Sequence, residues 1–233
     1  MIDAAAAARI NPARATITIP LPDDLASLIE HLDLRELTLV GHSMAGGEVA
    51  RYLTRHGCAR IARLVLVAPT TPCLRLGADN PVGVPREIFD AMIDALSADR
   101  PAFMAASSPG FFGEHGSAQM IAWVVSLALR SSPLAAMAMV RAFSTTDFRG
   151  DMASFKRPTL IIHGDADQSS PLDLTGRRTA AAATGSRLKV YAGAPHGLFI
   201  THRAQFNADL LEFVGAGEGM PELNSRPGNS PAV

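Results

Sequence analysis

The chain has 233 residues with 21 Lys and Arg against 22 Asp and Glu, which gives a formal net charge of −1. Hydrophobic residues make up 48% of it and charged residues only 18%, so the composition excludes disorder for most of the chain. The length suits one domain with a core of its own. Because the charges balance, no basic surface is expected for nucleic acid or anionic lipid.

The two cysteines, Cys58 and Cys73, are too few for a disulfide framework and lack metal-ligand spacing. The alanine run at residues 4–8 is shorter than the apolar part of a signal peptide. No later stretch reaches the ~18 apolar residues that a membrane-spanning helix needs. We therefore expect a soluble cytoplasmic protein without a metal.

The first part of the chain alternates between helix and strand. Pro22 opens a helix that extends to about residue 33, with apolar residues at helical spacing. The apolar runs at 37–40 and 64–67 predict buried parallel strands, and a helix over 45–56 lies between them. This order predicts an α/β protein with a mostly parallel sheet.

The middle of the chain breaks this alternation. Residues 70–156 contain no strong strand, but helical patterns begin at Pro85 and Pro133 and a third covers residues 120–129. A block of helices inserted into an α/β alternation is most simply a cap over one end of the sheet.

Alternation resumes in the last third, with strands at 159–162 and 188–191, a helix from Pro171 and another over about 203–214. The tail is rich in Gly, Pro, Ser and Asn, which favours disorder. The expected organisation has four parts: an irregular N-terminal segment (1–21), an α/β core (22–69 and 157–214), a helical cap (70–156) and a disordered tail (215–233).

A candidate nucleophile lies between the first predicted strand and the following helix. The segment Gly41 to Gly47 fits G-x-S-x-G, with Ser43 at the serine and Ala45 at the last position. A tight turn there lifts the serine hydroxyl out of the sheet and turns the Met44 amide and the helix N-terminus toward an oxyanion. We therefore interpret Ser43 as a nucleophile and Met44 as an oxyanion-hole residue.

A serine nucleophile needs a base, and the base needs a carboxylate that orients it. Two later strands are followed by suitable residues: Asp165 and Asp167 after the strand at 159–162, and His196 after the strand at 188–191. The order Ser, Asp, His is that of α/β hydrolases. His196 is favoured over His202 because it follows its strand directly, whereas spacing cannot separate the two aspartates.

The residues around these positions resemble one family, the cofactor-free (non-heme) bacterial haloperoxidases or chloroperoxidases with their aryl-esterase relatives. The similarity runs from about residue 22 to 214. It rests on the following strings: Leu32-Asp33-Leu34, Leu39-Val40-Gly41-His42-Ser43-Met44, Gly46-Gly47-Glu48-Val49-Ala50-Arg51-Tyr52, Phe143 with Thr146-Asp147-Phe148, His163-Gly164-Asp165 with Asp167-Gln168 and Pro171, and Pro195-His196-Gly197.

This resemblance implies an α/β-hydrolase fold with a helical cap and a triad of Ser43, Asp167 and His196. It also implies hydrolysis of small esters, in some members with formation of peracids that oxidise halide, and neither heme nor metal. A related branch hydrolyses lactams.

The chain departs from that family most strongly at its N-terminus. In this fold the nucleophile follows the fifth strand, but the residues before 37 leave no room for four strands and their connections. We therefore expect an N-terminally truncated fold, without the His-Gly motif that supplies a second oxyanion amide. The strand at 37–40 is then an apolar sheet edge.

Three functions are consistent with these residues. The first is a serine hydrolase that acts on small esters or carboxylic acids. The second is a catalytically impaired relative that self-associates through the exposed sheet edge, and the third is a lactam or amide hydrolase.

Overall fold

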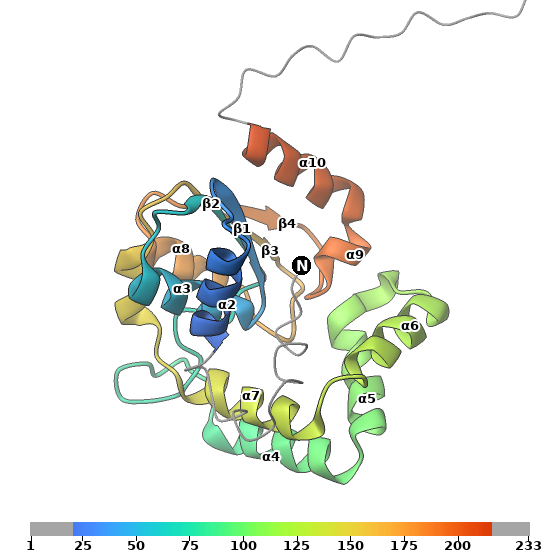
Figure 1. The fold of residues 1–233 in the computed structure, drawn as a ribbon. Coiled ribbons are helices and arrows are strands. Elements are labelled where there is room, and N and C mark those ends of the chain that lie inside the picture. Colours follow the sequence, from blue (N-terminus) through green and yellow to red (C-terminus); the bar gives the residue numbers. More distant parts are fainter. Residues whose placement is uncertain (1–20, 216–233) are drawn as a thin grey trace, which may run out of the picture.

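A computed structural model describes residues 21–215 and places a parallel sheet at the centre of the protein (Figure 1). Its four strands lie in the order β1-β2-β3-β4, and every neighbouring pair is parallel. The strands are β1 (Leu37–His42), β2 (Ile61–Val67), β3 (Thr159–Gly164) and β4 (Arg187–Tyr191). Each predicted strand is confirmed, at slightly greater length.

Helices cover both faces of the sheet (Figure 1). One face carries α2 (Leu21–His31), α3 (Ala45–His56), the 3₁₀ helix η3 (Arg149–Ser154) and α8 (Gly176–Ala182). The other face carries α9 (Leu198–Thr201) and α10 (Arg203–Gly215). Because crossover helices cover both faces, the strands are apolar on both sides, which explains their continuous hydrophobic runs.

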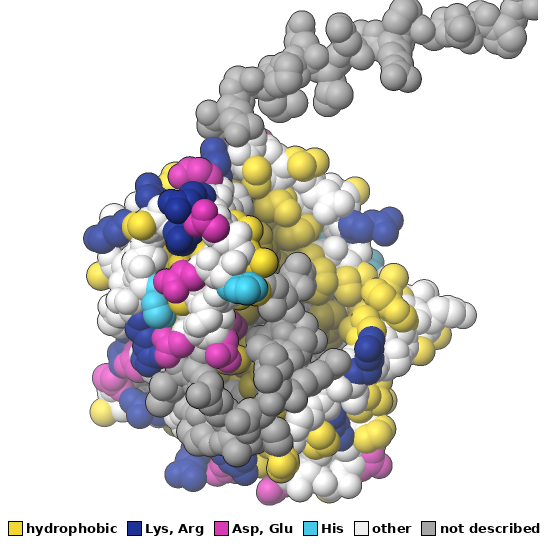
Figure 2. Space-filling view, in the orientation of Figure 1, with side chains coloured by type: hydrophobic (Ala, Val, Ile, Leu, Met, Phe, Trp, Pro, Cys, Tyr) yellow, Lys and Arg dark blue, Asp and Glu magenta, His cyan; other side chains and the backbone are white. Residues whose placement is uncertain are grey.

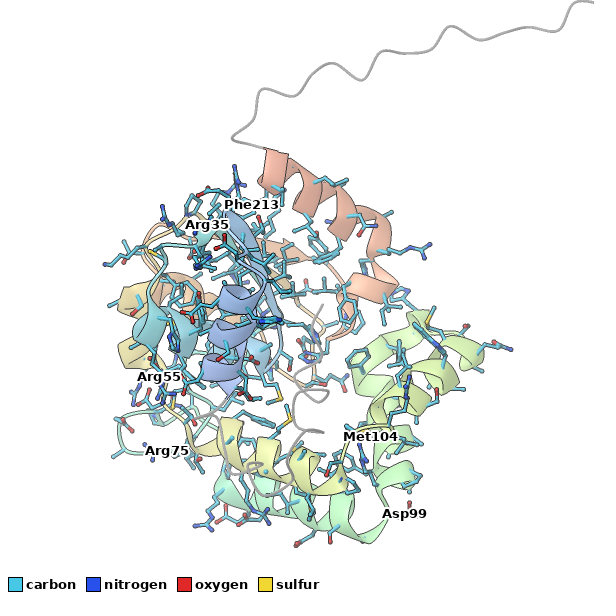
Figure 3. All side chains as sticks on the ribbon, viewed as in Figure 1. Arg35, Arg55, Arg75, Asp99, Met104 and Phe213 are labelled. Carbon is cyan, nitrogen blue, oxygen red and sulfur yellow. The ribbon has the colours of Figure 1, made fainter. Side chains whose placement is uncertain are left out.

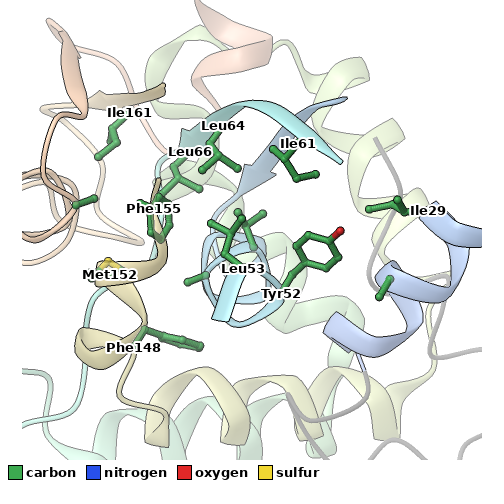
Figure 4. Close-up of a cluster of buried hydrophobic side chains, with 14 residues drawn as sticks. Ile29, Tyr52, Leu53, Ile61, Leu64, Leu66, Phe148, Met152, Phe155 and Ile161 are labelled. Carbon is green, nitrogen blue, oxygen red and sulfur yellow. The ribbon is translucent and has the colours of Figure 1, made fainter. Parts of the chain in front are cut away.

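Strand β2 shows how the two cores are divided. Leu64 and Leu66 point into a cluster with side chains of α2, α3 and η3 (Figure 4), whereas Val65 and Val67 join side chains of α9 and α10. This alternation follows from the two-residue period of a strand. All four residues are buried.

A block of helices lies between β2 and β3 in the chain and to one side of the sheet (Figure 1). This helical block consists of α4 (Arg86–Ala98), α5 (Arg100–Phe112), the 3₁₀ helix η2 (Gly113–His115), α6 (Ala118–Ala128) and α7 (Pro133–Thr145). It has its own hydrophobic cluster, in which Phe89, Ile93 and Leu96 of α4 meet Val140 of α7. The inserted helices are thus confirmed, whereas the domain boundaries stay a prediction.

Two helices differ from expectation. Helix α5, which carries Met104 (Figure 3), has no counterpart among the predicted elements; it begins after Asp99, whose carboxylate accepts a hydrogen bond from the Ala102 amide. Helix α8 begins at Gly176 rather than at Pro171. The Thr175 hydroxyl donates to the Pro171 carbonyl at 2.8 Å, and such local side-chain bonds compete with helix formation.

No single helix within residues 21–215 is long and apolar enough to cross a membrane. Helices α6 and α7 reach the length and composition together, but they are bent by 94°. The expected irregular N-terminal segment and disordered tail fall almost wholly on residues 1–20 and 216–233, outside the described part of the chain.

The end of β3 depends on a glycine. A Cβ atom on Gly164 would lie 1.9 Å from the Ala194 carbonyl oxygen, which accepts a hydrogen bond from the Ala166 amide at 3.2 Å. We expect Gly164→Ala to lower the free energy of unfolding by about 3 kcal/mol, measured by urea denaturation. The control is Gly150→Ala, where a Cβ meets nothing within 4 Å; equal losses in the two variants would contradict the prediction.

Candidate active site

Ser43 occupies a strained turn directly after β1. Its φ is +56°, a left-handed conformation that residues other than glycine rarely adopt. The turn is fixed to the end of β2, because the Ser43 amide donates to the Val67 carbonyl at 2.9 Å and the Ser43 carbonyl accepts from the Thr70 amide at 3.2 Å. The predicted strand–turn–helix context of Ser43 is therefore present.

Two glycines let α3 approach the sheet closely. A Cβ on Gly41 would lie 2.8 Å from the Ala45 carbonyl oxygen, and one on Gly46 would lie 2.9 Å from Pro69 Cβ. Ala45 itself, which stands at the last position of the motif, is the first residue of α3. Its methyl group is therefore compatible with this turn.

Met44 is the N-cap residue of α3. Its amide donates no hydrogen bond to any residue between 21 and 215. A free amide at a helix N-terminus attracts negative charge. This position therefore offers one donor for an oxyanion beside Ser43.

Asp167 lies in the loop after β3 and is 5% exposed. Its Oδ1 accepts hydrogen bonds from the Ser169 and Ser170 amides at 2.9 and 2.8 Å, and its Oδ2 accepts one from His196 Nδ1 at 2.7 Å. Asp165 is exposed instead and accepts from the Gly193 amide at 2.6 Å. The structure thus brings Asp167, and not Asp165, to His196.

The Asp167 carboxylate is held in its ionised form. Burial alone would raise its pKa, but hydrogen bonds from His163, His196 and the Ser170 amide outweigh burial, so the pKa of Asp167 lies below its ordinary value. His163 Nε2 lies 3.2 Å from Asp167 Oδ2 and 2.7 Å from the Ser170 carbonyl oxygen. Because both partners are acceptors, Nε2 carries the proton.

His196 follows β4 and is 5% exposed. The loop that carries it is tied to the Asp167 loop through the hydrogen bond between the Ala166 amide and the Ala194 carbonyl. With Asp167 on Nδ1, the remaining ring nitrogen, Nε2, is the one available to take a proton. His202 instead bonds the Thr201 hydroxyl at 2.9 Å.

The turn with Ser43 and the loop with His196 meet through His42. The His42 Nε2 atom lies 3.2 Å from the His196 carbonyl oxygen. Within residues 21–215 no hydrogen bond joins the Ser43 hydroxyl to His196, which is common for catalytic pairs without substrate. The arrangement provides a hydroxyl, an imidazole with a bound carboxylate, and a free helix-terminal amide.

Two contacts of this site were absent from the sequence interpretation. Phe111 of α5 lies 5.7 Å from His196 between ring centroids, and its carbonyl accepts from the Gly197 amide at 2.7 Å. The sequence does hold a signal for α5: Asp99 followed by Pro101 is a usual beginning of a helix, and it was overlooked. The contact between His42 and His196 had no signal, because it joins a side chain to a backbone carbonyl and no sequence pattern reports such a bond.

A small, shallow hollow lies beside Met44. Its walls are formed by Leu21, Met44, Gly47, Glu48, Phe143 and Phe148. Burial, helped by the charge of Asp24, raises the pKa of Glu48 to about 7. The Glu48 carboxyl group has no hydrogen bond or ion pair with any residue from 21 to 215, so none of these residues compensates its charge at alkaline pH.

The described part of the chain holds no group of three or more His, Cys, Asp or Glu side chains that could bind a metal. Cys58 and Cys73 are both free thiols.

Comparisons with known proteins agree with the fold and the site described above. The sequence profile of the alpha/beta hydrolase fold matches residues 8–203. A non-heme chloroperoxidase from Kitasatospora aureofaciens is 39% identical over 201 residues, which cover 82% of this chain and 72% of that protein. A bifunctional esterase/perhydrolase from Acinetobacter calcoaceticus is 32% identical over 198 residues, with coverages of 82% and 72%.

Among solved structures, a bromoperoxidase from Bacillus anthracis superposes with a TM-score of 0.80 at 37% identity. The superposition covers 83% of this chain and 72% of the bromoperoxidase.

Glu48 should make stability depend on pH. Because its pKa in the folded protein is about 7, above the ordinary 4.5, the folded state binds more protons than the unfolded state between these values. The free energy of unfolding therefore falls as the pH rises from 4.5 to about 7, because Glu48 gives up its proton more readily in the unfolded protein than in the folded one. We expect Glu48→Gln to exceed the parent protein by about 1–2 kcal/mol at pH 8 and to match it near pH 4.5.

The measurement is urea denaturation at both pH values. The exposed Glu30 provides the control, since Glu30→Gln should change stability by the same small amount at each pH. A Glu48→Gln difference that is constant with pH would show that Glu48 is ionised normally in the folded protein.

Proposed function

Because the chain belongs to the alpha/beta-hydrolase family, among the non-heme haloperoxidases and their esterase relatives, we propose that it hydrolyses small acyl esters through Ser43, His196 and Asp167. The observation that carries this proposal is the buried hydrogen bond between His196 Nδ1 and Asp167 Oδ2 at 2.7 Å. It leaves Nε2 of the imidazole for a serine proton, and Ser43 lies on the strained turn next to His42, which contacts His196.

The reaction begins when the Ser43 hydroxyl attacks the ester carbonyl and its proton passes to His196 Nε2. Asp167 remains ionised and stabilises the imidazolium, since its pKa is low. The Met44 amide stabilises the oxyanion. His196 then gives the proton to the leaving alcohol, and the acyl group stays on Ser43. Water, activated by His196, releases the acid and restores the serine.

The same acyl-enzyme allows a second outcome. If hydrogen peroxide replaces water as the nucleophile, the acyl group leaves as a peracid and Ser43 regains its proton. The peracid then oxidises halide away from the protein, as the names of the perhydrolase and chloroperoxidase relatives suggest. Every step uses Ser43, His196, Asp167 and an amide, so this proposal requires no cofactor.

The substrate class follows from the helical block. We propose that this block caps the site, because Phe111 of α5 contacts His196. Its side chains are mainly apolar, and Figure 2 shows hydrophobic side chains gathered on this side of the molecule. An apolar cap favours small, uncharged acyl groups.

The free thiols of Cys58 and Cys73 support a cytoplasmic location.

The edge of the sheet supports a second proposal, self-association. Within the described residues β1 pairs only with β2, and its apolar side chains, including Leu39 and Val40, are only half-buried. Such an edge presents free backbone groups to another strand. A second copy could add its own β1 there in an isologous contact.

The proposed hydrolase activity is tested by comparing the rates at which the parent protein and the Ser43→Ala variant hydrolyse p-nitrophenyl acetate. We expect Ser43→Ala to lower kcat by at least about 10³-fold, and a fluorophosphonate probe to label the parent protein at Ser43 only. Asp167→Asn should lower kcat roughly 10³- to 10⁴-fold, because the orienting carboxylate is lost. Hydrolysis at equal rates by the Ser43→Ala and parent proteins would refute the proposal.

Asp165→Asn is the matched control. The asparagine oxygen can still accept the hydrogen bond from the Gly193 amide, so kcat should stay within about twofold of the parent value. If Asp165→Asn instead caused the larger loss, the assignment of Asp167 would be wrong.

Self-association is tested by light scattering coupled to size-exclusion chromatography. We expect a concentration-dependent dimer for the parent protein and a monomer for Thr38→Lys, because a charge on the edge strand opposes pairing. A parent protein that is monomeric at every concentration would exclude association through β1.

A further inference from the structure

His42 lies directly against the proposed base. The His42 and His196 rings are 4.7 Å apart between centroids, and His42 Nε2 is 3.2 Å from the His196 carbonyl oxygen. Because a carbonyl only accepts, His42 Nε2 carries the proton and donates it to this bond. The contact therefore reaches the backbone of His196 and leaves its ring nitrogens to Asp167 at Nδ1 and to the reaction at Nε2.

Aromatic rings hold His42 in this position. Phe199 of α9 meets it edge-on at 4.8 Å, and Phe111 of α5 does so at 6.1 Å. Phe111 also contacts the next residue of the base loop, since its carbonyl accepts from the Gly197 amide at 2.7 Å. The backbone of residues 196 and 197 is thus bound from the strand side by His42 and from the helical block by Phe111.

His42 also keeps one charge state. Burial, followed by the nearby His196, lowers the pKa of His42 to about 3. The other titratable groups that face this pair are Asp167 and His163. A neutral His42 neither takes the serine proton nor repels the imidazolium that forms on His196.

We propose that His42 is a positioning residue, which ties the loop carrying the base to the turn carrying the nucleophile. The bond from Asp167 fixes the His196 ring at Nδ1 only, so the ring still moves whenever its backbone moves. His42 restricts that motion together with Phe111, and it does so from the position adjacent to Ser43. Since consecutive Cα atoms are ~3.8 Å apart, this hydrogen bond limits how far the base can move from the nucleophile.

The inference rests on the proposed function and is tested with a pair of variants of similar length. His42→Gln keeps an N–H donor near the position of Nε2, whereas His42→Met has no donor. Both lose the ring, so packing losses cancel in the comparison. The readouts are kcat and KM on p-nitrophenyl acetate per site titrated by a fluorophosphonate, from pH 5 to 9.

We expect kcat of His42→Met to be roughly 5- to 10-fold below that of His42→Gln, the loss caused by one hydrogen bond. KM should agree within about twofold, and the midpoint of the pH profile in both variants should equal that of the parent protein, because His42 is neutral throughout this pH range. Equal kcat values would overturn the inference. A midpoint that moves from its parent value in both variants would also overturn it, since His42 would then exchange protons itself in the parent protein.

A measurement that needs no turnover separates this inference from the proposed function. The His196 Nδ1 proton, hydrogen-bonded to Asp167, should give a downfield proton NMR signal that disappears in His196→Asn. We expect this signal to broaden by solvent exchange in His42→Met and to stay sharp in His42→Gln, even if the parent protein proves inactive. If His42→Met fails to fold, His42→Phe, which keeps the ring contacts and lacks the donor, replaces it in both measurements. A sharp signal in the folded donor-free variant would refute the role of His42.

Discussion

The carboxylate of Asp167 organises the site because it binds two loops at once. Its Oδ1 accepts the Ser169 and Ser170 amides and its Oδ2 accepts the imidazoles of His163 and His196. A buried anion is stable only when its oxygens are satisfied in this way. The position of His196 therefore follows from the same bonds that make burial of the charge tolerable. Removing the His163 imidazole would leave the carboxylate with one hydrogen bond fewer and would hold His196 less firmly.

The parallel sheet explains why these groups meet at all. All four strands run in the same direction, and crossover connections on the two faces join them. The loops after β1, β3 and β4 therefore all emerge at the carboxyl ends of the strands. Residues separated by more than a hundred positions in the chain are brought together there. Gly41 and Gly46 then let α3 pack closely against the sheet, and Gly164 lets the loops after β3 and β4 approach closely enough for the hydrogen bond between Ala166 and Ala194.

Much of this organisation was predictable from the sequence, for physical reasons. Strands buried on both faces appear as apolar runs, and a serine between such a run and a helix has few other interpretations. The choice between Asp165 and Asp167 was different, because both lie in one loop and spacing carries no information about side-chain direction. It depends on which carboxylate meets the Ser169 and Ser170 amides and the histidines. Helix α5 escaped detection because Pro109 and Gly110 interrupt its pattern near the end.

The hydrogen bond between Phe111 and Gly197 connects the helical block to the loop that carries the proposed base. Helix α5 belongs to the block beside the site, while Gly197 follows the proposed base. Any displacement of α5 would reach His196 through this 2.7 Å hydrogen bond and through the ring contact between Phe111 and His196. If the helical block caps the site as proposed, fit and reactivity are coupled: we expect a substrate that forces α5 outward to bind but to react slowly, so that discrimination between acyl groups falls on the chemical step.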